Sequence, residues 1–76
     1  MSGHRVDPKP GDRVEVMMAM GNFDANVVKV EARLSSDGER SLVWVTIEVD
    51  GMGGEVPIHH IVRVFNAVEA LARMDQ

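Results

Sequence analysis

The chain has 76 residues, of which 45% are hydrophobic and 26% charged, and its formal net charge is −4. This length allows one small domain, and a domain of this size buries only about 60% of its unfolded surface. The absence of cysteine excludes disulfides and thiolate metal sites, and three histidines make at best a poor metal site. Oligomerisation is the remaining way to stabilise so small a fold, so we expect a homo-oligomer, most simply a symmetric dimer.

The acidic balance argues against nucleic acid as a partner, because nucleic acids are bound mainly through Lys and Arg. One small basic patch keeps a weak nucleic-acid-binding role open, and it consists of Arg13, Lys29, Arg33 and Arg63. No apolar run is long enough for a transmembrane helix, and the N-terminus lacks the apolar region of a signal peptide. We therefore expect a cytoplasmic protein with no membrane partner and no cofactor.

The first half of the chain has the pattern of a β protein. Residues 1–10 are polar and contain prolines and a glycine, which predicts a flexible N-terminal arm. Residues 13–20 alternate between two faces, as a half-buried strand does, and residues 21–24 have turn chemistry. Residues 25–34 alternate again, and the Asp-Gly pair at 37–38 is a strong hairpin signal.

The second half continues with shorter elements. Residues 40–49 form the clearest strand because β-branched side chains dominate it. The glycine-rich residues 50–54 predict a loop. Residues 55–58 predict a short strand, which Pro57 confines to a sheet edge or a strand end.

The C-terminal part predicts a tight turn, a fifth strand and a helix. Residues 59–61 form the turn and residues 62–65 the strand. Residues 66–76 change to a helical period, and Asn66 with Glu69 has the form of a capping box. A helix this short needs to dock on another element to be stable.

Together these elements predict a mainly β fold. Their layout over residues 11–65, between the arm 1–10 and a C-terminal helix 66–76, resembles a five-stranded SH3-like small barrel. One alternating face of each strand would fill the core. The expected core residues are Val14, Val16, Met18, Val28, Val30, Leu34, Val43, Val45, Ile47, Val56, Ile58 and Val64.

A surplus of apolar residues on the opposite face is the most informative feature. These residues are Met17, Ala19, Val27, Leu42, Trp44, Ile61 and Phe65. Either the C-terminal helix covers part of them, with Val68 and Leu71 on Trp44 or Leu42, or they form an interface with a second copy or another protein. Aromatic residues and methionine are enriched at such interfaces, so we take this face as the candidate interface.

The adjacent histidines His59 and His60 are the next candidate. Adjacent side chains point in different directions, so the pair does not easily hold one metal ion. We interpret the pair as a polar one-turn link between the last two strands. The alternative is a small-molecule site in which Ile58, His59 and His60 contact a ligand.

The layout resembles SH3-like barrels in general and the type II dihydrofolate reductases in particular. That family begins its barrel with Gly-Asp-Arg-Val, here residues 11–14, and ends with a Val-x-Ile strand, here residues 56–58. Pro57 and His59 stand where that family has the Gln and Tyr that line a shared central pore. The resemblance therefore implies a barrel that oligomerises, and only as an alternative a pore enzyme or small-molecule binder.

Two further resemblances are limited to short motifs. His60 matches the last-strand Lys-His pair of Sm-like RNA-binding proteins, and the start of the barrel is similar to that of KOW and Tudor modules. We therefore expect a small non-enzymatic binding or regulatory module that acts through protein–protein contact, of the kind that phages or mobile elements encode.

Overall fold

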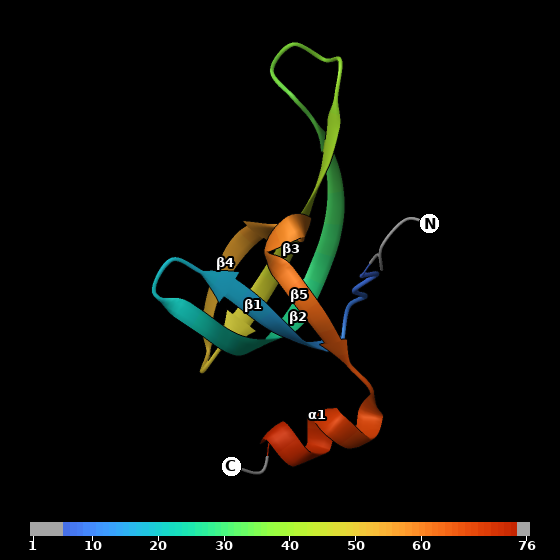
Figure 1. The fold of residues 1–76 in the computed structure, drawn as a ribbon. Helices are drawn as coiled ribbons and strands as arrows, with labels where there is room; N and C mark the ends of the chain where they lie inside the picture. The colour runs from blue at the N-terminus through green and yellow to red at the C-terminus, as the bar shows by residue number, and fades with distance from the viewer. Residues whose placement is uncertain (1–5, 75–76) are drawn as a thin grey trace, which may run out of the picture.

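A computed structural model describes residues 6–74 of the chain. Five strands form one antiparallel sheet, and a short helix follows it (Figure 1). The elements are β1 (Arg13–Met18), β2 (Gly21–Leu34), β3 (Ser41–Val49), β4 (Met52–Pro57), the 3₁₀ turn η1 (Ile58–His60), β5 (Ile61–Phe65) and α1 (Ala67–Met74). The expected mainly β class, with five strands and a short C-terminal helix, is confirmed.

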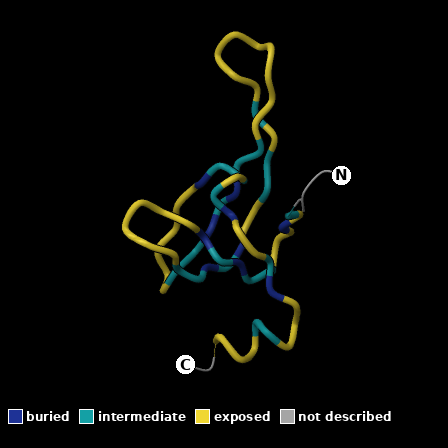
Figure 2. Tube along the Cα trace, in the orientation of Figure 1, coloured by how far each residue is buried: buried dark blue, intermediate teal, exposed yellow. Residues whose placement is uncertain are grey.

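The strand order in the sheet is β4-β3-β2-β1-β5, so β4 and β5 are its two edges. The β2 and β3 strands extend beyond the rest of the sheet as a long hairpin that projects from the body of the molecule (Figure 1). Figure 2 shows that the end of this hairpin is exposed, while burial is concentrated where the five strands come together.

Two of the predicted turns are placed differently. Residues 21–24 are the start of β2 and not a turn, because Phe23 and Ala25 pack inward in strand alternation. The predicted loop at 50–54 is reduced to a two-residue turn, since Val49 and Met52 are already paired. Asp50 and Gly51 have φ of 52° and 81°, as a type I′ hairpin turn requires.

The core consists of side chains from all five strands, and eight of them form one buried cluster. These are Val14, Val16, Ala25, Val27, Val45, Ile47, Val56 and Ile61. Three residues expected in the core are exposed instead: Met18 by 41%, Val28 by 54% and Leu34 by 72%. Leu34 lies near the end of the projecting hairpin, where no other element covers it.

A bulge in β2 explains the error at Val28. Val27 pairs with Ile47 and Lys29 pairs with Thr46, so Val28 is an extra residue without a partner on β3. An extra residue reverses which face the following side chains occupy. Ala25 and Val27 therefore point inward before the bulge, and Val30 packs against the core after it.

A second bulge acts in the same way on β5. Glu15 pairs with Arg63 and Val16 with Ile61, so Val62 has no partner on β1. Ile61 and Val64 both reach the core as a result, although their spacing of three residues does not fit strict alternation.

The N-terminal segment that was expected to be a flexible arm is docked in the part that the structure describes. Pro8 is buried and Val6 packs against the core. Gly11 has φ of 95°, and its N–H donates to the carbonyl of Val27. Residues 1–5 of the expected arm lie outside the described residues.

The bulge in β2 gives a direct test with two neighbouring valines. Val27→Ala should lower the free energy of unfolding by about 2 kcal/mol, because the side chain is 3% exposed and its loss leaves a cavity. Val28→Ala should change it by less than about 0.5 kcal/mol. Urea denaturation measures both values, and an equal or reversed effect would contradict the bulged register.

Candidate functional site

The structure divides the expected interface face into buried and exposed residues. Val27 and Ile61 are in the core and Phe65 is buried on the other side of the sheet, so these three are not available to a partner. The bulges in β2 and β5 explain why Val27 and Ile61 lie in the core and not on the expected interface face. Met17 and Leu42 are exposed by 47% and 39%, and Ala19 is exposed in the turn between β1 and β2. The seven residues therefore do not form one continuous apolar surface.

Trp44, the expected centre of the interface, is half-buried beneath a polar cluster. The guanidinium carbon of Arg33 lies 5.5 Å from the Trp44 ring centroid. Arg33 also donates to both carboxylate oxygens of Glu55, at 3.1 and 2.6 Å, and to Glu31 at 3.3 Å. The hydrogen bond from Arg33 lowers the pKa of the Glu55 carboxyl, and hydrogen bonds from Arg33 and Lys29 lower that of Glu31. The outer face around Trp44 is therefore covered by charged side chains that are paired with one another.

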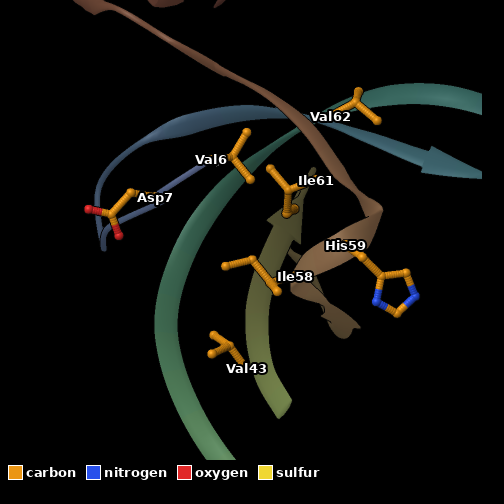
Figure 3. A pocket seen from close by; sticks show the side chains of 7 residues that line it. All are labelled: Val6, Asp7, Val43, Ile58, His59, Ile61 and Val62. Atoms are coloured by element: carbon orange, nitrogen blue, oxygen red, sulfur yellow. The ribbon is translucent and has the colours of Figure 1, made fainter. Parts of the chain in front are cut away.

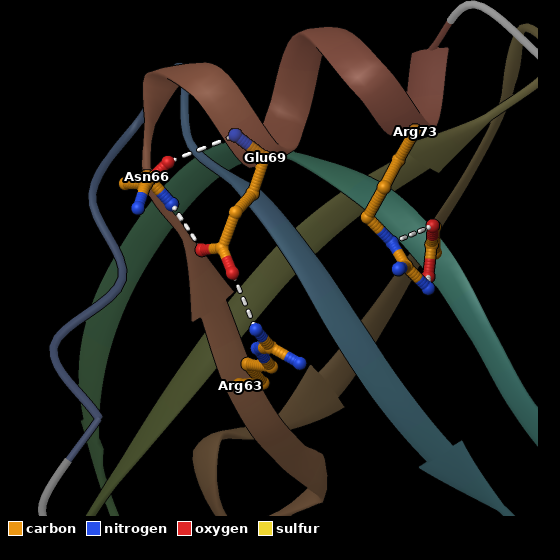
Figure 4. A network of polar contacts seen from close by, with 5 residues as sticks. Arg63, Asn66, Glu69 and Arg73 are labelled. Atoms are coloured by element: carbon orange, nitrogen blue, oxygen red, sulfur yellow. Dashed lines mark hydrogen bonds and ion pairs between the residues drawn. The ribbon is translucent and has the colours of Figure 1, made fainter.

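The C-terminal helix begins with the expected capping box (Figure 4). The Asn66 side chain accepts from the Glu69 N–H at 2.8 Å, and the Glu69 carboxylate accepts from the Asn66 N–H at 3.1 Å. The same carboxylate also accepts from Arg63 on β5. The backbone hydrogen bond at Asn66 and the nearby Arg63 hold the pKa of the Glu69 carboxyl below its usual 4.5.

The other end of α1 is held to β2. Arg73 donates to both oxygens of Asp24, at 2.6 and 3.1 Å, across a separation of 49 residues. The Arg73 guanidinium also lies 4.3 Å from the Phe65 ring centroid, and Arg63 lies 5.1 Å from the same ring. Phe65 is thus buried beside two arginines. The polar side of the helix, with Glu69 and Arg73, faces the sheet.

This docking leaves the apolar side of α1 exposed. Val68, Leu71 and Met74 are spaced by three residues and are 77%, 69% and 58% exposed, and no residue of the helix is buried. We call these three residues the helix stripe. The expectation that Val68 and Leu71 cover Trp44 or Leu42 is wrong, because the ion pairs turn the polar side of the helix inward.

A second apolar surface lies beside the edge strand β4. It is a groove of about 420 Å³ whose walls include Met18, Phe23, Ile47, Val49, Met52 and Val56, with Asp50 and Glu55 at its border. Gly54 pairs with Ile47 and has no side chain to cover it, which leaves the groove open at this point. We call this hollow the methionine groove, since methionine adapts well to varied apolar partners. Sequence reasoning missed it because 50–54 was interpreted as a loop.

A larger groove of about 820 Å³ includes two of the three residues expected to contact a ligand. Ile58 and His59 line it together with Val6, Asp7, Val43, Ile61 and Val62 (Figure 3). His60 is not among its lining residues, and its buried Nδ1 has no hydrogen-bond partner within residues 6–74. The rings of His59 and His60 are edge to face at 4.8 Å. The pair occupies the expected one-turn link, which the structure forms as the 3₁₀ turn η1.

The four residues of the expected basic patch each contact a neighbouring polar group. Arg33 is bonded to two carboxylates and Arg63 to Glu69, while Lys29 lies 3.2 Å from Glu31. Arg13 donates to the Asn26 side chain at 3.0 Å. The cations are therefore divided among several local pairs.

Other features give no further candidate site. Within residues 6–74, no group of three or more potential ligands is placed to hold a metal ion. The helices of this part of the chain are too short to cross a membrane. Comparison with models of protein families, with curated proteins and with solved structures finds no match to this chain.

The capping box makes the docking of α1 sensitive to acid. Because the pKa of Glu69 is lowered in the folded protein, its contribution to docking is complete above the ordinary pKa of 4.5 and is lost as the pH falls through the lowered pKa. Amide hydrogen exchange of α1 measured between neutral and acidic pH should show the helix loosening. Glu69→Gln should remove this part of the pH dependence, and an unchanged profile in that variant would contradict the role of Glu69.

Proposed function

We propose that this protein is a small non-enzymatic binding module that acts through protein–protein contact, with the helix stripe as its recognition surface. The observation that carries this proposal is the orientation of α1. A helix of eight residues is not stable alone, and its apolar side is normally the side that docks. Here the capping box and ion pairs dock the polar side, so Val68, Leu71 and Met74 face solvent.

The partner that fits such a stripe is a protein with a short apolar groove. Recognition of an amphipathic helix in a groove depends on apolar anchors that recur at helical spacing. The stripe itself carries no charge, and the charged residues Glu69 and Arg73 are already paired with the sheet. The helix is thus folded before it meets a partner, which reduces the entropy lost on binding.

The layout supports a related proposal about the fold. The sheet has five antiparallel strands, and a single 3₁₀ turn joins the last two. We propose that the fold is of the SH3-like small-barrel kind. Many unrelated binding functions occur on such folds, so the functional argument rests on the stripe.

The stripe can be tested by photo-crosslinking in the cells that produce the protein. A benzoylphenylalanine at position 71 should give adducts with a specific protein, whereas the same group at Ser36, in the exposed β2–β3 turn, should not. Adding Val68→Glu should abolish the adducts without changing stability by more than about 0.5 kcal/mol, because the side chain is exposed. Equal adducts at both positions, or adducts that survive Val68→Glu, would overturn the proposal.

The groove beside η1 favours a second candidate function, the binding of a small apolar molecule with a polar head. Its walls are mostly aliphatic, and the His59 imidazole and Asp7 carboxylate supply polar groups. This combination of apolar walls and few polar groups is typical of ligand sites.

A medium-chain alcohol such as decanol is a suitable probe for this groove, because its neutral hydroxyl can donate to the Asp7 carboxylate without charge repulsion. It should raise Tm by mass action if it binds the folded state. Val62→Trp should fill the groove and abolish the rise, whereas Val28→Trp, at an exposed position away from the groove, should retain it. A Tm that does not respond in the unmodified protein would eliminate this alcohol as a ligand, and an equal response in both variants would place binding elsewhere.

A further inference from the structure

We propose that two copies of this chain form a symmetric dimer through antiparallel pairing of their β4 edges, with Met52 of each copy inserted over Gly54 of the other. This inference concerns the methionine groove and does not rest on the proposed role of the helix stripe. It assigns an occupant to the groove from the pattern of the β4 strand itself.

The two edges of the sheet differ in how they are protected. An edge strand offers unpaired N–H and C=O groups to any other strand, and proteins commonly block it with bulges, proline or charged side chains. The β5 edge has the bulge at Val62 and the charged Arg63. The β4 edge pairs with β3 without a register shift, and its exposed part, Met52–Glu55, has no proline. Its one charged side chain, Glu55, is hydrogen-bonded to Arg33 of β2. Pro57 blocks only the far end of this strand.

The β4 strand presents a protruding side chain and a hollow on the same face. Met52 pairs with Val49 and Gly54 pairs with Ile47, so both positions face the core side of the sheet. Met52 is 75% exposed. A Cβ at Gly54 would meet no atom within 4 Å. The strand thus has an exposed apolar side chain at Met52 and, two residues further on, an open space at Gly54.

Antiparallel pairing about a two-fold axis at Gly53 would cover the Met52 side chain and fill the space at Gly54. In this register Met52 lies directly opposite Gly54 of the second copy, and Gly54 lies opposite Met52 of the second copy. Directly opposite residues of antiparallel strands share a face, so each Met52 enters the other copy's methionine groove. A two-fold interface requires this reciprocity, since each contact occurs twice.

The charges near the edge are compatible with this register, despite the net charge of −4. Glu55 would lie opposite Gly51 of the second copy, and Asp50 opposite Val56. No two carboxylates are directly opposite, and the Glu55 carboxylate is already held by Arg33. The contact surface is small for a protein–protein interface, so we expect dissociation in the micromolar range or weaker.

Gly54→Val tests the hollow with little risk to the fold. The φ of Gly54 is outside the left-handed region, its Cβ position is open, and valine favours strands. The matched control is Ser41→Val, which adds valine at an exposed strand position that pairs with Leu34 in the projecting hairpin, away from the β4 edge.

Sedimentation equilibrium from about 1 µM to about 1 mM covers the affinities expected of a weak dimer. The unmodified protein and Ser41→Val should shift from monomer to dimer, and Gly54→Val should stay monomeric. Met52→Ala is a second variant in case Gly54→Val does not fold, and it should weaken the dimer at least about tenfold. A monomeric unmodified protein would overturn the inference. So would a dimer retained by both Gly54→Val and Met52→Ala, or one lost equally in the two valine variants.

Discussion

The bulge at Val28 is the constraint on which the rest of the structure depends. It allows one long strand to turn Ala25 and Val27 toward the core before the bulge and Val30 after it. Without the extra residue, strict alternation could turn either Ala25 and Val27 or Val30 toward the core, but not all three. Asp24, which holds Arg73 of α1, lies before the bulge, where β2 pairs regularly with β1. One irregularity in the sheet therefore allows β2 to contribute to the core on both sides of the bulge, while its regular first part holds the helix.

The two apolar surfaces that remain exposed arise for different reasons. The helix stripe is exposed because polar contacts at both ends of α1 take the side that faces the sheet. The methionine groove is exposed because a glycine occupies the position opposite Ile47. One surface is thus set by ion pairs and the other by a missing side chain. Each can be altered by substitution at positions that do not contribute to the core.

Two local signals in the sequence predicted their own structures well. The capping box at Asn66 and Glu69 and the hairpin at the Asp-Gly pair depend on residues within a few positions of each other, and both elements formed as expected. The positions of Val27, Ile61 and Phe65 could not be obtained in this way. The first two depend on bulges whose positions are set by pairing with other strands, and Phe65 is covered by arginines from β5 and α1. Of the three residues expected to contact a ligand, Ile58 and His59 line the groove beside η1, and His60 does not.

The projecting β2–β3 hairpin has a practical consequence. Its turn at residues 35–40 is exposed throughout and lies at the end of the two longest strands, away from the buried cluster. Chains tolerate insertion best at exposed turns whose backbone supports no other element. A fluorophore, an affinity tag or a second domain placed in this turn would thus leave both termini and both apolar surfaces in their native sequence. The hairpin is the natural attachment point for labelling this protein.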